Sequence, residues 1–270
     1  MITSSSSRQI KNISLLLKKA KERKKQGLFV VEGMKMLREA PCDWVQKVYL
    51  AERIQGSEDA NALLELYDCE VVSDQVFDAA ADTRTPQGVL ALVKIPVYPL
   101  DALLQGEDTL LLVLESIQDP GNLGTMLRTG EGAGITGILM NQTTADLFSP
   151  KTIRSTMGSI YRVPYYIAED LPEVLLALKQ RRIRLCAADL RGAVCYDTLD
   201  YTAGGNAFLI GNEGNGLTRG LSELSDVRVR IPMEGRVESL NAAISASLLM
   251  YEALRQKRQT DCGGAYEDLV

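Results

Sequence analysis

The chain has 270 residues and a mass of 29.6 kDa, a length that suits two domains better than one. Its hydrophobic content of 46% and charged content of 24% are close to globular averages, which excludes wholesale disorder, and no apolar run approaches the ~20 residues of a membrane-spanning helix. The absence of histidine excludes Ser-His-Asp and Cys-His catalysis and histidine-ligated metals.

Cysteine content and charge distribution narrow the class of protein further. Five cysteines without CxxC spacing argue against a zinc cluster or a disulfide framework, so we expect no metal and a reducing, cytoplasmic location. The net charge of −5 is unevenly distributed along the chain. Residues 1–40 carry ten Lys or Arg and three acids, a net charge of +7, and the remaining 230 residues carry −12. A basic N-terminal segment on an acidic body is expected where one end of a protein meets phosphate, although a solvated helix face is the simpler explanation of the charge taken alone.

Short helices and strands alternate through the first part of the chain. Residues 1–7 are predicted to be a disordered leader, and residues 94–108, with Pro96, Pro99 and Gly106, to be a linker. Between them the pattern predicts helices at 10–26, 34–40, 59–67 and 74–80, and strands at 28–31, 45–50, 70–72 and 88–93.

Apolar runs and amphipathic segments also alternate after the linker. Strands are predicted at 109–114, 137–140, 183–189, 207–210 and 227–231, an extended segment at 162–166, and helices at 122–133, 152–158, 172–181 and 240–256. Repeated β–α units of this kind predict an α/β fold with a mostly parallel sheet and helices on both faces, followed by a polar tail at 257–270.

Two glycine patterns are rejected as nucleotide sites. Residues 132–137 fit GxGxxG but end a helix and precede a strand, the reverse of the dinucleotide fingerprint. Residues 211–218 have Walker A spacing, but Leu217 stands where lysine belongs and Glu213 would repel a phosphate. This loop therefore binds something other than a nucleoside triphosphate.

Three segments carry most of the information, and each lies at the carboxyl end of a predicted strand, where α/β sheets bind ligands. They are LVLESIQDPGNLGTMLRTGEGAG (112–134), FLIGNEGNGLT (208–218) and IPMEGRVESLNAAISASLLMYEAL (231–254). Together they resemble the motifs of the SpoU/TrmH family of RNA 2′-O-ribose methyltransferases, within the knotted SPOUT superfamily. Upstream, FVVEGMKMLREA and TRTPQGVLALV resemble the family's N-terminal substrate-binding domain, so the resemblance covers roughly residues 11–256.

The resemblance implies a domain organisation and a chemistry. It implies an RNA substrate-binding domain at 1–93, a methyltransferase domain with a trefoil knot at 109–256, and a homodimer through the last helix of the second domain. S-adenosylmethionine is the implied cofactor, with a binding site at Leu209, Ile210, Gly211, Gly216, Ile231, Met233 and Leu240. The implied catalytic residues are Asn122, Arg128, Glu213, Ser239 and Asn241. RNA contacts are expected from the basic residues Lys18, Lys19, Lys24, Lys25, Lys151 and Arg154.

Each candidate catalytic residue also has a purely structural explanation, which for Arg128 is an ordinary solvated or salt-bridged position on a helix. Asn122, Ser239 or Asn241 could cap a helix, and Glu213 could fix its loop by accepting backbone N–H bonds. The family proposal makes Arg128 the proton acceptor for the ribose hydroxyl. A guanidinium with a pKa above ~12 stays protonated, so positioning of an RNA phosphate is the physically easier role for Arg128.

The leading hypothesis is therefore S-adenosylmethionine-dependent methylation of a ribose 2′-hydroxyl, with ribosomal RNA favoured because a separate N-terminal domain adds RNA-binding surface. Two rivals are a transfer RNA 2′-O-methyltransferase and a non-catalytic RNA-binding protein with the same fold. The presence of all five candidate catalytic residues argues against the second rival.

Overall fold

The computed structural model describes residues 1–104, 106, 108–190 and 194–262, and the chain divides into two compact units. The first unit contains residues 1–97 and 146–161, and the second contains residues 98–145 and 162–270. Residues 146–161 lie within the span predicted for the methyltransferase domain, yet they pack with the N-terminal residues. No helix in the described part of the chain is long and apolar enough to cross a membrane.

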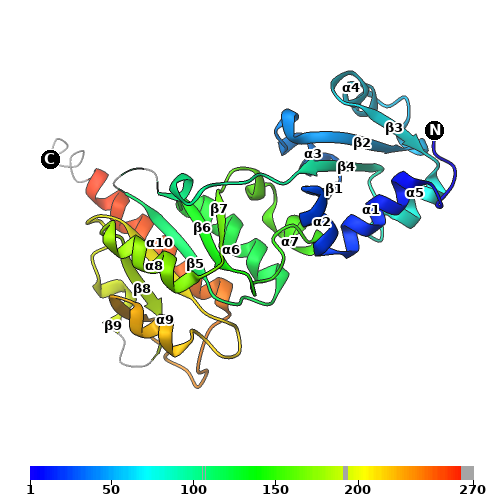
Figure 1. The fold of residues 1–270 in the computed structure, drawn as a ribbon. Helices are drawn as coiled ribbons and strands as arrows, with labels where there is room; N and C mark the ends of the chain where they lie inside the picture. The colour runs from blue at the N-terminus through cyan, green and yellow to red at the C-terminus, as the bar shows by residue number, and fades with distance from the viewer. Residues whose placement is uncertain (105, 107, 191–193, 263–270) are drawn as a thin grey trace. The chain divides into compact units, whose positions relative to one another are not determined.

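The first unit is built on a four-stranded mixed sheet (Figure 1). Its strands lie in the order β1 (Leu28–Glu32), β4 (Val89–Lys94), β2 (Val45–Ala51) and β3 (Cys69–Val72), and only the β2–β3 pair is parallel. The helices of this unit are α1 (Arg8–Lys18), α2 (Ala20–Gln26), α3 (Met34–Glu39), α4 (Glu58–Leu66), α5 (Asp74–Ala80) and α7 (Pro150–Thr156). The core forms where Ile10, Ile13 and Leu16 of α1 pack with Phe77 of α5 against the sheet.

The predicted disorder of residues 1–7 is wrong at its start. The backbone N–H of Ile2 donates to the Val71 carbonyl at 2.7 Å, and the N–H of Ser73 donates to the Ile2 carbonyl at 2.9 Å. Ile2 thereby forms a parallel bridge with Val72. Because β3 is an edge strand with unpaired backbone groups, it offers the N-terminus a partner that local composition does not reveal.

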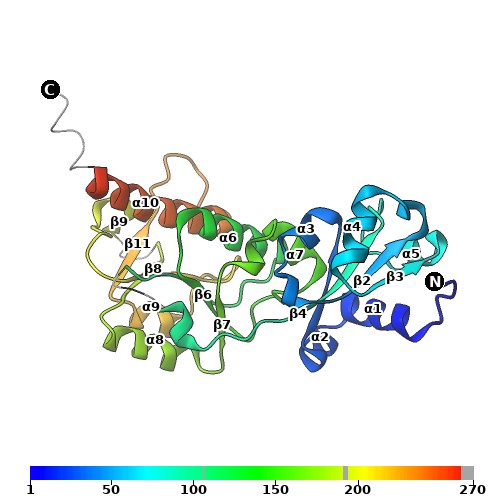
Figure 2. The same ribbon diagram turned by 90° about the horizontal axis from the view of Figure 1, so that it is seen from above.

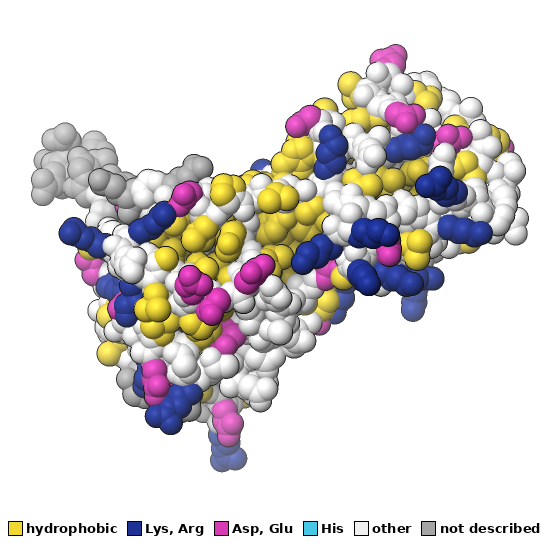
Figure 3. Space-filling view, in the orientation of Figure 1, with side chains coloured by type: hydrophobic (Ala, Val, Ile, Leu, Met, Phe, Trp, Pro, Cys, Tyr) yellow, Lys and Arg dark blue, Asp and Glu magenta, His cyan; other side chains and the backbone are white. Residues whose placement is uncertain are grey.

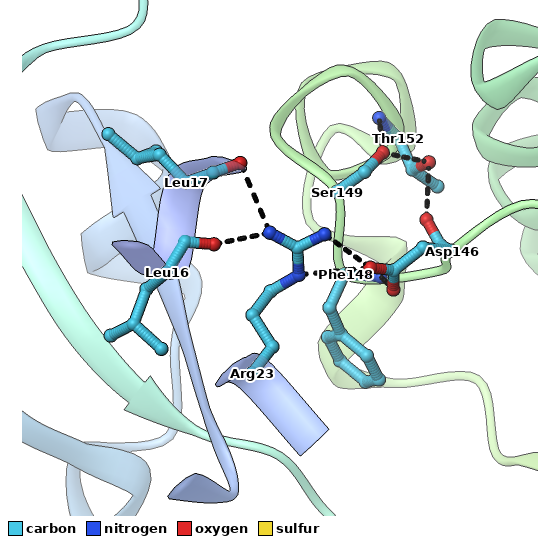
Figure 4. A network of polar contacts seen from close by, with 7 residues as sticks. All are labelled: Leu16, Leu17, Arg23, Asp146, Phe148, Ser149 and Thr152. Carbon is cyan, nitrogen blue, oxygen red and sulfur yellow. Dashed lines mark hydrogen bonds and ion pairs between the residues drawn. The ribbon is translucent and has the colours of Figure 1, made fainter. Parts of the chain in front are cut away.

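The predicted single helix over 10–26 is two helices that meet at Lys19, which has an extended backbone (φ −124°, ψ 108°). The break leaves carbonyls at the end of α1 without helical partners. Arg23 is only 4% exposed, and its guanidinium donates to the carbonyls of Leu16 and Leu17 and forms an ion pair with Asp146 (Figure 4). Arg23 therefore satisfies the end of α1 and joins it to the 146–161 segment.

The described residues of the second unit form a seven-stranded sheet in which every strand pair is parallel. The strand order is β7 (Tyr165–Ala168), β6 (Gly137–Asn141), β5 (Leu110–Leu114), β10 (Asn206–Ile210), β8 (Arg184–Ala188), β11 (Val227–Arg230) and β9 (Val194–Cys195). The central strand β10 and its neighbour β5 are buried along their whole length, as a parallel sheet covered on both faces requires.

Helices cover both faces of this sheet (Figure 2). One face carries α6 (Pro120–Ala133) and α10 (Ala242–Cys262), which pack on each other, and the other carries α8 (Leu171–Gln180) and α9 (Arg219–Leu224). The predicted α/β architecture is confirmed. Helix α10 continues beyond residue 256 into the segment predicted as a polar tail, and the rest of that tail, 263–270, lies outside the described residues.

Candidate active site

A cavity of about 450 Å³ opens at the carboxyl ends of β8, β10 and β11. This is the edge of the sheet at which the sequence predicts a ligand. The cavity is lined by Ala188, Asp189, Leu190, Ile210, Gly211, Asn212, Glu213, Gly214, Asn215, Gly216, Leu217, Val229, Arg230, Ile231, Met233, Glu238, Ser239, Leu240, Ala242, Ser245 and Leu249. Its volume falls in the range of about 300–1,000 Å³ that holds drug-sized ligands.

Most of the predicted cofactor residues line this cavity: Ile210, Gly211, Gly216, Ile231, Met233 and Leu240. The structure instead places Leu209 in the hydrophobic core, fully buried among residues of α8 and the neighbouring strands. The reason is strand geometry, because consecutive side chains of β10 point to opposite faces of the sheet.

The chemistry of the lining fits S-adenosylmethionine. Apolar side chains such as Ile231, Met233 and Leu240 offer a surface for a flat base. The charged residues are the carboxylates Asp189, Glu213 and Glu238 against the single guanidinium of Arg230. This excess of negative charge suits a cofactor that carries a sulfonium and an ammonium group.

The loop between β10 and α9 is folded tightly on itself. Asn212 and Gly216 exchange backbone hydrogen bonds, with N···O distances of 3.1 and 2.8 Å. A Cβ on Gly211 would lie 2.1 Å from the Gly216 carbonyl carbon, so only glycine fits there, and Gly216 has a positive φ of 69°. A Cβ on Gly214, by contrast, would make only an ordinary contact, 3.5 Å from the Asn212 Oδ1.

Three of the predicted catalytic residues form one chain of side-chain hydrogen bonds. Asn241 caps α10, since its Oδ1 accepts from the backbone N–H of Ala243 at 2.8 Å. Its Nδ2 donates to Asn122 Oδ1 at 3.0 Å, and Asn122 Nδ2 donates to Glu213 Oε1 at 3.0 Å. The helix cap fixes which way each amide points, so the chain runs in one direction and ends on a carboxylate.

Glu213 is also held by the turn before α6. Its carboxylate accepts backbone N–H groups of Gln118 and Asp119, both at 3.0 Å. Partial burial tends to raise the pKa of Glu213, but the hydrogen bonds from Gln118, Asn122 and Asp119 outweigh it and hold the pKa below its ordinary value. Glu213 is therefore an anion that fixes two loops together, the structural role weighed from the sequence, and is poorly suited to take up a proton.

The two remaining catalytic candidates lie outside this chain. Ser239 lines the cavity, and its hydroxyl has no protein partner in the described part of the chain, so Asn241 rather than Ser239 provides the helix cap. Arg128 lies on α6, is exposed, and makes no hydrogen bond or ion pair with any described residue. It is available to a ligand that approaches from solvent.

The predicted RNA-binding residues all belong to the first unit. Lys18, Lys19, Lys24 and Lys25 are exposed on α1 and α2 and at their junction, where Figure 3 shows Lys and Arg side chains gathered. On α7, Lys151 is exposed. Arg154, on the same helix, forms an ion pair with Asp82.

Sequence reasoning missed Glu115, the residue directly after β5. Glu115 is only 7% exposed, and its Oε2 accepts the backbone N–H of Thr218 at 2.8 Å. A charged residue directly after a fully apolar strand was the available signal, because carboxylates are rarely buried without a partner.

Comparison with known proteins identifies the family. Residues 109–251 match the SpoU rRNA methylase family, and residues 7–91 match the MRM3-like substrate binding domain. The chain belongs to the SpoU rRNA methylase family. The resemblance seen in the sequence is confirmed, and with it the class of enzyme, an RNA 2′-O-methyltransferase, and the cofactor S-adenosylmethionine.

Relatives in this family match over nearly the whole chain. The chain is 31% identical to 23S rRNA (guanosine(2553)-2′-O)-methyltransferase RlmP of Bacillus subtilis, over 86% of this chain and 90% of that protein. It is also 31% identical to 23S rRNA (uridine(2479)-2′-O)-methyltransferase of Streptomyces viridochromogenes, over 90% and 88%. Among solved structures, the SpoU methyltransferase AviRb from S. viridochromogenes in complex with AdoMet superposes with a TM-score of 0.86 at 28% identity, covering 93% of this chain and 98% of that one.

No group of three or more cysteine, aspartate or glutamate residues is placed to hold a metal ion within the described residues. The four cysteines whose side chains are described are free thiols.

Proposed function

We propose that this SpoU family member methylates a ribose 2′-hydroxyl of ribosomal RNA. The observation that carries the proposal is the Asn241–Asn122–Glu213 chain of hydrogen bonds, which joins the three motifs beside a cavity suited to S-adenosylmethionine. Ribosomal rather than transfer RNA is supported by the match of residues 7–91 to a substrate-binding domain and by the 23S rRNA substrates named for two relatives.

The residues of the site divide the work between binding and positioning. S-adenosylmethionine, when bound, supplies an activated methyl group, so the protein must chiefly align the ribose oxygen and draw off its proton. Asn122, Glu213 and Asn241 hold the three motifs in place relative to one another. Arg128, exposed on α6, binds the phosphate beside the reacting ribose. The hydroxyl of Ser239 lies in the cavity wall, where it is free to bind the cofactor or the ribose.

We also propose that the 211–218 loop and the last helix, α10, form the trefoil knot of the SPOUT fold. Residues from both segments line the same cavity, which supports a cofactor held between them. A cytoplasmic location is part of the same proposal, supported by the free thiols and by a ribosomal RNA substrate.

A methyl-transfer assay tests the main proposal. Tritium-labelled S-adenosylmethionine is incubated with the protein and with either 23S rRNA or total tRNA from a strain that lacks the gene. We expect label in 23S rRNA at a single 2′-O-methyl site, and loss of that label with Asn122→Ala. Label in tRNA alone would contradict the ribosomal assignment, and cofactor binding without transfer to either RNA would indicate a non-catalytic protein.

A homodimer through α10 is the second part of the proposal. The small residues Ala242, Ala243 and Ala246 are buried within the subunit, so they do not form the dimer surface. Instead, Ile244, Leu248 and Tyr251 are 50%, 36% and 47% exposed, and their spacing of four and three residues places them on one face of the helix. A continuous apolar stripe of this kind is typical of a surface that binds a partner.

Sedimentation tests the dimer. We expect a species of twice the 29.6 kDa chain mass at micromolar concentration, and a single-chain species for the Ile244→Asp, Leu248→Asp double variant. Leu176→Asp, an exposed leucine on α8, is the control and should leave the dimer intact. A wild-type protein that sediments as one chain would contradict the proposal.

A further inference from the structure

The loops that follow β5 and β10 are tied together by carboxylates that reach in opposite directions. The two strands are parallel neighbours with Leu114 opposite Ile210, and the N–H of Glu115 donates to the Ile210 carbonyl at 2.9 Å. This is the last backbone bond of the pair. Beyond it, the first loop (residues 115–119) leads into α6, and the second loop (residues 211–218) leads into α9 and lines the cavity.

Each loop supplies one carboxylate and receives one. Glu213 of the second loop accepts the N–H groups of Gln118 and Asp119 at the end of the first loop. Glu115, at the beginning of the first loop, accepts the N–H of Thr218 at the end of the second. The resulting reciprocal clasp, Glu115 with Thr218 and Glu213 with Gln118 and Asp119, holds the second loop at both its middle and its end.

We propose that Glu115 is a positioning residue for cofactor binding, because its bond to Thr218 keeps the 211–218 loop in the shape that forms the cavity wall. The inference rests on S-adenosylmethionine as the cofactor and not on which RNA is methylated. Two features of the loop make its end critical. Gly211 is packed against the backbone of Gly216 and Leu217, so a shift near Thr218 is transmitted to the start of the loop. Residues 210–217 all line the cavity.

The physical argument concerns preorganisation. With Glu115 in place, the loop is ordered before the cofactor arrives, and binding does not have to supply the free energy of ordering it. Without an acceptor at this position, the N–H of Thr218 loses its partner and the loop samples other conformations. The apparent affinity for the cofactor then falls by the fraction of molecules whose loop is competent to bind.

Three variants separate the acceptor, the charge and the reach of Glu115. Glu115→Gln keeps an oxygen acceptor of the same reach without the charge, Glu115→Asp keeps the charge with a shorter reach, and Glu115→Leu removes the acceptor while filling the space. By calorimetric titration with S-adenosylmethionine, we expect about 3-fold weaker binding for Gln, and about 10- to 100-fold weaker binding for Leu, with Asp between them.

The matched control is Glu252→Leu. Glu252 is a similarly buried carboxylate of the same unit, 9% exposed, but its partners Arg255 and Gln256 lie on α10 away from both loops. We expect this variant to be less stable towards urea and to bind S-adenosylmethionine with unchanged affinity. Amide exchange in the absence of cofactor is a second readout, in which the Thr218 amide should exchange faster in Glu115→Leu and at the wild-type rate in Glu252→Leu.

A positioning role for Glu115 also predicts which kinetic constants its variants change. The Glu115 variants should raise the KM for S-adenosylmethionine and keep kcat at saturating cofactor within about 3-fold of wild type, since no group that touches the substrate has changed. If Glu115→Leu does not fold, the comparison of Asp with Gln decides, because only an acceptor of full reach should preserve binding. Wild-type affinity in Glu115→Leu, equal affinities for Asp and Gln, or an equal loss in Glu252→Leu would overturn the proposal. Failure of the wild-type protein to bind the cofactor would instead contradict the proposed function.

Discussion

Arg128 is the one candidate catalytic residue that neither lines the cavity nor belongs to the Asn241–Asn122–Glu213 chain of hydrogen bonds. It is exposed on α6, while the cavity is lined by the 211–217 loop, by strand ends, by residues 238–240 and by one face of the first part of α10. Arg128→Ala should therefore bind S-adenosylmethionine within about 3-fold of wild type, while methyl transfer falls by about 100-fold or more. Calorimetric titration and single-turnover transfer measure the two effects.

The conservative variant distinguishes the possible roles of Arg128. Arg128→Lys keeps the charge but not the planar pair of N–H groups that clamps a phosphate. We expect it to recover only part of the lost activity. An equal loss of cofactor binding in Arg128→Ala would show that Arg128 is structural.

Gly211 is the residue at which the backbone of the 211–218 loop tolerates no side chain. The close backbone approach in this loop is at Gly211, whereas Gly216 has open space around it and only a positive φ. Gly211→Ala should abolish cofactor binding, because its Cβ would lie 2.1 Å from the backbone of Gly216 and Leu217. Gly214→Ala is the matched control and should bind the cofactor normally. Comparable titrations for the two variants would contradict this geometry.

At the scale of elements, the sequence predicts a helix or strand well where neighbouring residues determine it, and poorly where a contact with a distant residue determines it. The buried strand at 110–114 was predictable because a continuous apolar run flanked by turns has few other structures open to it. The break between α1 and α2 was not, since no glycine or proline marks Lys19 and the stabilising bond runs from Arg23 to Asp146, 123 residues away. The role of Glu115 could not be predicted for the same reason, because its partner Thr218 is 103 residues away. The identity of the site came from the three motifs and their family resemblance rather than from periodicity.

The Arg23 anchor can be tested directly. Arg23→Met keeps the aliphatic stem but removes the donor to the Leu16 and Leu17 carbonyls and the ion-pair partner of Asp146, which should destabilise the first unit by about 2 kcal/mol. Trp44 is the one tryptophan of the chain and lies in this unit, so its fluorescence during urea unfolding reports on the first unit specifically.

A control variant and a double variant test whether the loss of stability comes from the Arg23–Asp146 ion pair. Lys24→Met removes an exposed charge from the same helix and should leave the unfolding midpoint unchanged. The Asp146→Asn variant combined with Arg23→Met should cost less than the sum of the two single changes, because both remove the same ion pair. Additive effects would show that the pair contributes nothing of its own.

At the scale of the whole molecule, the charge split seen in the sequence has a defined structural location. The basic N-terminal segment is not uniformly available, since Arg23 is buried in an ion pair and serves the fold. The neighbouring lysines are exposed, and no ion pair engages them within the described residues. A segment that exposes several unpaired cations on an otherwise acidic chain is suited to contact RNA phosphates.

This assignment predicts a change in salt dependence. Affinity for RNA should fall with rising salt as counterions are released, and replacing Lys18, Lys19, Lys24 and Lys25 with Gln should flatten the slope of log K against log salt by up to roughly 3, at about 0.7 per lost phosphate contact. The measurement is filter binding of a 23S rRNA fragment across a series of salt concentrations. Cofactor affinity should not change, because these lysines belong to the first unit and the cavity to the second.

A control with the same change in net charge tests whether location matters. It replaces with Gln four basic residues that are already engaged by acceptors within the protein, namely Lys94, Lys179, Arg181 and Arg219. If RNA binds through the N-terminal segment, the control keeps the wild-type slope while the lysine variant loses it. Slopes that are flattened equally in the two variants would mean that overall charge, rather than the exposed lysines of α1 and α2, governs RNA affinity. An unchanged slope in the lysine variant would mean that RNA binds elsewhere on the molecule.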